Sequence, residues 1–152
     1  MAMDLRVALP ALLPLAIQWA GERAHEVALS GSPPDTHRAG IARAVGVKKP
    51  ELIRIALVQA LPLPDDPDLR AAALQTGLLG PGMVGLTLGY SVIVCRGHDT
   101  ARLLSHEFRH VYQYENAGSI AAFLPGYLQQ IVEFGYKNAP LENDARLHEI
   151  DA

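Results

Sequence analysis

The last third of the chain carries a run of helix signals, and these constrain the fold more than any other feature. Thr100 is suited to cap a helix over residues 101–116, and Gly118 is suited to end it. A second helix is predicted over residues 119–134 and a third from Pro140 onward, because proline is well tolerated in a first helical turn. Three consecutive helices predict a helical C-terminal half.

The first half of the chain mixes helix and strand signals. Short apolar, β-branched runs bounded by turn residues predict strands, whereas longer stretches that follow a capping residue predict helices. The expected elements are a helix at 5–30, a short helix ending at Ala44, a strand at 52–58, a helix at 67–75 and a strand at 85–95. We therefore expect an α+β fold in which N-terminal helices and a small β-sheet precede the helical half.

Composition narrows the class of protein. The 152 residues fit one domain, and a net charge of −3 with no basic stripe argues against a nucleic-acid partner. Cys95 is the single cysteine, which excludes an internal disulfide and suits a reducing compartment. These features predict a cytoplasmic protein.

The N-terminal run VALPALLPLAIQWA is apolar enough to resemble an export signal. Asp4 precedes this run, Pro10 and Pro14 interrupt it, and no clear cleavage site follows. The run is also shorter than the ~20 apolar residues needed to cross a bilayer. We interpret it as a buried helix with no membrane partner, and export remains the alternative.

The sequence HEFRH, within the helix predicted at 101–116, is a candidate metal site. His106 and His110 stand four residues apart and so share one helix face. Glu107 is rotated by about 100° from His106, so its carboxylate can reach a metal-bound water without binding the metal. Arg109 is expected on the solvated face. The alternative is an ordinary amphipathic helix whose histidines pack in the core or face solvent.

A catalytic zinc ion needs a third protein ligand and an open fourth position. LENDAR, at residues 141–146, offers Glu142 and Asp144 at the start of the last predicted helix. Either carboxylate could be the third ligand, and if Glu142 binds the metal, Asp144 could orient a ligating histidine through a hydrogen bond. Gln113, three residues after His110, is a further candidate for such a bond, with a place on the surface as the alternative.

HEFRH followed by a helix, a turn and Glu142-Asn143-Asp144-Ala145 resembles the gluzincin metallopeptidases. The E-x-x-A form is similar to that of the CAAX proteases, and the small size is similar to the minigluzincins and to uncharacterised bacterial HExxH domains. The resemblance covers residues 86–146, although the stretch between His110 and Glu142 matches neither thermolysin nor the CAAX proteases in length. It implies a single zincin-like metallopeptidase domain over 1–152, with His106, His110 and Glu142 as zinc ligands and Glu107 as catalytic base.

The chemistry of such a site predicts further roles. Zinc lowers the pKa of its bound water to about 7, and Glu107 would take a proton from that water and pass it to the leaving amine. Tyr136 and His148 are candidate donors to the developing oxyanion, with a structural role as the alternative for each. In the family, an edge strand before the active-site helix pairs with peptide, so residues 86–94 are expected either to line the cleft or to form a buried central strand.

The sequence thus predicts a zinc metallopeptidase, a hydrolase that acts on a peptide or protein substrate. Because the chain is too small for a second subdomain to enclose a deep cleft, we expect a shallow site or one completed by a homodimer or partner protein. A non-catalytic zinc protein with a structural or regulatory role is the first alternative. A metal-free helical domain that binds a partner is the second.

Overall fold

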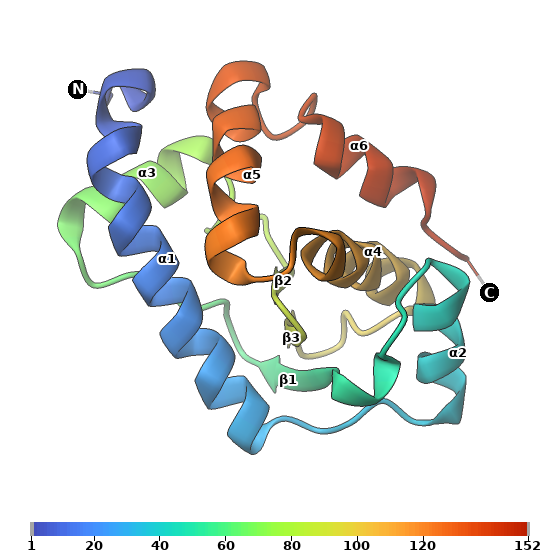
Figure 1. Ribbon diagram of the computed structural model, residues 1–152. Coiled ribbons are helices and arrows are strands. Elements are labelled where there is room, and N and C mark those ends of the chain that lie inside the picture. The colour runs from blue at the N-terminus through green and yellow to red at the C-terminus, as the bar shows by residue number, and fades with distance from the viewer. Residues whose placement is uncertain (1, 152) are drawn as a thin grey trace.

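The computed structural model describes residues 2–151, which form six α-helices, a short 3-10 helix and a three-stranded sheet (Figure 1). The predicted α+β architecture with a helical C-terminal half is confirmed. The elements are α1 (Leu5–Ser30), α2 (Thr36–Ala44), the 3-10 helix (Pro50–Leu52), β1 (Arg54–Val58), α3 (Pro67–Thr76), β2 (Gly85–Leu88), β3 (Ser91–Cys95), α4 (Ala101–Ala117), α5 (Ile120–Phe134) and α6 (Pro140–Leu147).

Short-range capping explains why the helix boundaries lie close to those predicted. The Asp66 side chain accepts a hydrogen bond from the backbone N–H of Leu69 at the start of α3. Thr100 does the same for Leu103 at the start of α4. Gly118 ends α4 with a φ of 101°, a left-handed conformation that glycine adopts without strain.

The strand predicted at 85–95 is wrong as one element, because it is a hairpin of two strands. Gly89 has a φ of 68° and turns the chain between β2 and β3. The strand order is β1-β3-β2, with β1 parallel and β2 antiparallel to β3. The sequence left two alternatives for residues 86–94, an edge strand that lines a cleft or a buried central strand. The structure contains one strand of each kind, since β2 lies at the sheet edge and β3 is the buried centre.

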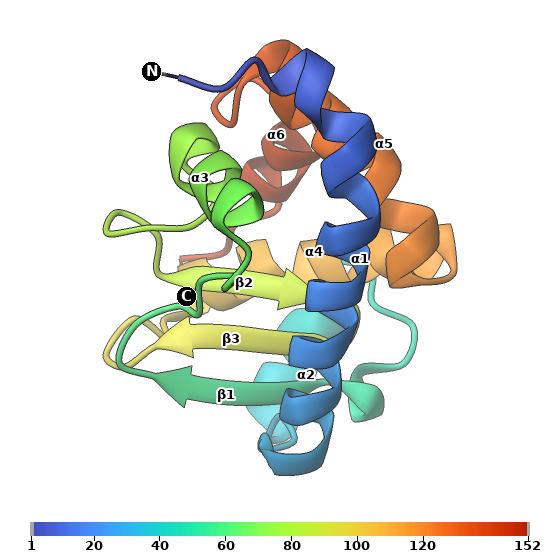
Figure 2. The ribbon, with the colours of Figure 1, turned by 90° about the vertical axis from the view of Figure 1, so that its left-hand side faces the viewer.

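The sheet is the middle layer of the molecule, and Figure 2 shows α1 crossing one face with α2 and α4 on the other. Successive β3 side chains point to opposite faces. Val92 and Val94 pack with residues of α2 and α4, whereas Ile93 and Cys95 pack with residues of α1 and α5. Strand β3 is therefore buried on both faces, and α4 packs against one of them.

The prediction that the N-terminal run forms a buried helix is wrong for most of α1. Three residues of this helix are buried, namely Leu12, Ala20 and Val27, while Val7 and Leu29 are exposed. The helix runs through both prolines and covers the sheet and α5 with one side. Within residues 2–151, none of the helices combines the length and apolar character that crossing a membrane requires.

Candidate metal centre

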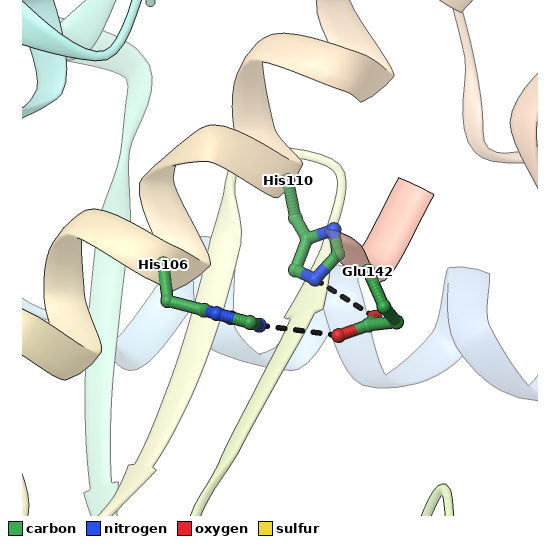
Figure 3. A group of neighbouring side chains, drawn as sticks. All are labelled: His106, His110 and Glu142. Atoms are coloured by element: carbon green, nitrogen blue, oxygen red, sulfur yellow. Dashed lines mark hydrogen bonds and ion pairs between the residues drawn. The ribbon is translucent and has the colours of Figure 1, made fainter. Parts of the chain in front are cut away.

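Two histidines of α4 and one glutamate of α6 meet in the interior (Figure 3). The Glu142 carboxylate lies between the rings, with Oε1 at 3.2 Å from His106 Nε2 and Oε2 at 2.9 Å from His110 Nε2. The relative exposures of His106, His110 and Glu142 are 7%, 6% and 1%. One nitrogen or oxygen of each residue lies within 4.8 Å of the others, so the three residues form a group that could hold a metal ion.

The rotation of α4 about its axis is set by its apolar stripe. Leu104, Phe108 and Val111 are almost fully buried in the core that includes β1 and β3. Their spacing of three and four residues fixes one helix face against the sheet. His106 and His110 lie on an adjacent face, which is directed toward α6. The apolar stripe that packs α4 against the sheet therefore also determines the direction in which the two histidines point.

Gln113 sets the tautomer of His110. The Gln113 Nε2 group donates to the carbonyl oxygen of Leu141 and to Asp144 Oδ2, both at 2.9 Å. Because these bonds fix the orientation of the amide, its oxygen Oε1 faces His110 Nδ1 at 2.8 Å and accepts the Nδ1 hydrogen. Nε2 of His110 is then the nitrogen that can bind a metal. The hydrogen bond predicted for Gln113 is confirmed.

Asp144 supports the site indirectly and is not part of the three-residue group. Arg109 Nε donates to Asp144 Oδ2 at 2.8 Å, and a second guanidinium nitrogen donates to the carbonyl oxygen of Val45 at 2.7 Å. Burial would raise the pKa of Asp144, but hydrogen bonds from Arg109 and Gln113 lower it. The Arg109 side chain is 16% exposed, so its expected place on a solvated face is wrong. The structure thus orients His110 through a chain from Arg109 to Asp144 to Gln113.

Glu149 orients the other histidine, and no spacing pattern in the sequence could have identified this residue. His106 Nδ1 donates to Glu149 Oε2 at 2.8 Å, which leaves Nε2 directed at Glu142. The segment that carries Glu149 follows α6 and is anchored to α4, because the backbone N–H of Ile150 donates to Ser105 Oγ at 2.8 Å. Each histidine therefore has a hydrogen-bond partner on the side away from Glu142.

Glu142 and His110 shift each other's pKa values in opposite directions. Burial by itself would lower the pKa of His110, but the hydrogen bond and charge of Glu142, together with the charge of Glu107, raise it to about 9. Burial would raise the pKa of Glu142, but hydrogen bonds from both histidines lower it well below its usual range. The hydroxyl of Tyr127, a residue that sequence reasoning missed, donates to Glu142 Oε2 at 2.7 Å. The carboxylate is thus held ionised where a buried cation would be stabilised.

Glu107 is buried beside this group and faces the edge strand. The Thr87 hydroxyl, on β2, donates to Glu107 Oε1 at 2.8 Å. A Cβ atom at Gly85 would lie 2.8 Å from Glu107 Oε2, so the absence of a side chain at this position makes room for the carboxylate. Glu107 lines the same cavity as His110 and Glu142. The structure therefore places the predicted base next to the three-residue group without making it a member.

The two candidate oxyanion donors lie in different surroundings. Tyr136 lines the same cavity, and burial followed by the negative charges of Glu142 and Glu107 raises the pKa of its hydroxyl. His148 follows α6, where its Nδ1 lies 2.7 Å from the backbone oxygen of Asp144, and it is absent from the cavity lining that residues 2–151 provide. The structure brings Tyr136 to the site and does not bring His148 there.

The separations between the group's atoms suit a small tetrahedral ion. Zinc–nitrogen and zinc–oxygen bonds of about 2.0–2.2 Å place the ligand atoms of a tetrahedral site about 3.3 Å apart. The observed histidine–carboxylate separations of 2.9 and 3.2 Å are close to that value, and one donor atom of each residue lies within 4.8 Å of the others. These separations are therefore compatible with a bound metal ion, of which zinc is one candidate.

Comparison with known proteins identifies neither a family nor a function for this chain. No family model, curated protein or solved structure matches this chain. The function therefore has to be inferred from the side chains themselves.

Proposed function

We propose that this chain is a zinc-dependent peptidase of the gluzincin type. One observation carries the proposal: within the buried group of His106, His110 and Glu142, both His110 and Glu142 line a cavity that Glu107 also lines. His106, His110 and Glu142 would hold the ion, and Glu107 would act as the general base.

The donor set favours a catalytic zinc site over a structural one. Two imidazole nitrogens and one carboxylate are the ligands of several catalytic zinc ions, whereas structural zinc sites are closed by four protein ligands, mostly thiolates. The single cysteine, Cys95, lies on β3 and packs in the core on the α1 side of the sheet. Three protein ligands leave one position for water or substrate.

The reaction is the hydrolysis of a peptide bond. A bound zinc ion would lower the pKa of water and polarise the substrate carbonyl. The Glu107 carboxylate accepts one proton of the attacking water while the water oxygen forms a bond to the carbonyl carbon. The carbon–nitrogen bond then breaks, and Glu107 delivers the same proton to the leaving nitrogen. One water is consumed, a carboxylic acid and an amine are released, and Glu107 returns to its ionised form.

Tyr136 is proposed as the donor to the developing oxyanion. Its raised pKa keeps the hydroxyl protonated at neutral pH, as a hydrogen-bond donor must be. Its position in the cavity wall beside Glu142 supports this role, and no catalytic role is assigned to His148.

Metal content is the first test. Protein purified without chelators or a histidine tag is expected to carry about one zinc per chain. Glu142→Ala should abolish this binding, whereas Asp144→Ala, two residues away on the same helix, should still bind one equivalent at saturating zinc. An absence of metal in the wild type, even after zinc is supplied, would favour the metal-free helical domain.

Hydrolysis by the zinc-loaded protein is the second test. Glu107→Gln is expected to retain zinc and lose at least about 100-fold in kcat on a mixed peptide library, which is the usual contribution of a general base. Glu133→Gln, an exposed change on α5, is the matched control and should remain active. Zinc binding without cleavage of any peptide would favour the non-catalytic metal protein.

A further inference from the structure

An apolar cavity opens directly onto the candidate metal centre. It offers a volume of about 150 Å³ and lies between α1, α3, α5 and the edge strand β2. Its charged lining residues are His110 and Glu142 of the candidate centre and the adjacent Glu107, and most of the remaining wall is aliphatic or aromatic. A ligand bound at the metal centre would therefore lie next to this apolar cavity.

Two walls of this cavity come from outside the segment that resembles gluzincins. Leu9 and Ala16 of α1, with Leu69 and Ala73 of α3, line it, and all four precede residue 86. These side chains point inward yet stay half-buried, so the chain's own core does not fill the space between the helices. Apolar surface left open beside a polar centre is typical of a ligand pocket.

The size and chemistry of the cavity select its occupant. An apolar cavity of about 150 Å³ can hold a benzene ring, so this one has room for a single bulky side chain such as phenylalanine or leucine. A lysine or glutamate side chain would lose its water against the walls of α1 and α3 without gaining a partner there. Burying one large apolar side chain favours binding by about 10- to 150-fold.

We propose that the substrate carries a bulky apolar side chain next to the cleaved bond, and that the cavity between α1, α3 and α5 binds this side chain. The inference rests on the proposed peptidase function, because the cleaved bond is located by Glu107 and the metal group. The cavity itself can be tested without metal and without catalysis.

Trp19 provides the metal-independent test. It is the single tryptophan and lines the cavity, and its indole Nε1 is buried with no hydrogen-bond partner among residues 2–151. In metal-free protein, 3-phenylpropanamide should shift the indole N–H resonance saturably. Ala73→Phe, which fills the cavity, should abolish that shift. Ala71→Phe, an exposed change on the same helix, should retain it. No saturable shift, or an equal shift in Ala73→Phe, would overturn the inference.

Peptide cleavage provides the second test. Once a cleaved peptide is known, the residue on each side of the bond is changed in turn between phenylalanine and alanine. On one side, alanine should lower kcat/KM by about 10- to 150-fold. Ala73→Phe should remove this preference while Ala71→Phe keeps it. Should Ala73→Phe fail to fold, Ala16→Leu with its exposed control Ala11→Leu makes the same comparison on α1.

The outcomes separate the two proposals. Cleavage with equal rates for phenylalanine and alanine on both sides would overturn the cavity inference and leave the peptidase function standing. Binding of 3-phenylpropanamide without cleavage of any peptide would support the cavity and contradict the peptidase function.

Discussion

The metal-free protein is expected to lose stability as the pH rises from 6 to 9. His110 Nε2 contacts the buried Glu142 carboxylate at 2.9 Å, and its pKa is raised from 6.5 to about 9 in the folded state. Since the folded pKa lies above the unfolded one, the contribution of His110 to stability is complete below pH 6.5. It is lost as the pH rises through about 9.

The size of this loss follows from the shift in pKa. Each pKa unit corresponds to about 1.4 kcal/mol, so the His110 shift contributes about 3 kcal/mol at pH 6 and little at pH 9. The pKa of His106 is also raised, which adds in the same direction. The lowered pKa of Glu142 affects stability in a different pH range. The stability that Glu142 contributes is lost only as the pH falls through its folded pKa, far below pH 6.

Urea unfolding of chelator-treated protein at pH 6, 7, 8 and 9 measures this loss. The free energy of unfolding should fall by about 3 kcal/mol across the series, with an unchanged dependence on urea. His110→Gln should remove most of the slope, whereas His37→Gln, an exposed change on α2, should preserve it. A wild-type free energy that is constant to within about 0.5 kcal/mol would refute the reasoning.

Two further predictions concern residues that support the site. Gln113→Leu removes the acceptor that holds His110 Nδ1, so zinc affinity should fall about 10- to 100-fold in a competition titration with a chromogenic chelator; an unchanged affinity would mean that Gln113 does not set the tautomer. Gly85→Ala places a methyl group 2.8 Å from Glu107 Oε2, so the flexible carboxylate must move. Zinc should stay bound while kcat falls at least about tenfold, and full activity would contradict the assigned position of the base.

The sequence was a reliable guide where structure depends on near neighbours. Asp66, Thr100 and Gly118 make their capping contacts within a few residues, so the starts of α3 and α4 and the end of α4 could be predicted closely. The hairpin of β2 and β3 was missed, because an apolar run with a single Gly89-Tyr90 interruption has the same pattern as one long strand.

The sequence by itself determined the helical half of the fold and the shared helix face of His106 and His110. Both follow from a helical period of 3.6 residues and from local capping. That Glu142, and not Asp144, lies between the histidines was decided by the tertiary structure, since it depends on how α6 packs against α4.

The tertiary structure also decided which residues surround the site. Tyr127, Thr87 and Glu149 are far from the histidines in sequence, and their contacts depend on long-range packing that no short pattern encodes. The cavity between α1, α3 and α5 arises in the same way, because each helix contributes an apolar face and only their relative placement leaves space between them. Local periodicity can specify a helix face, but the neighbour it meets is set by the whole chain.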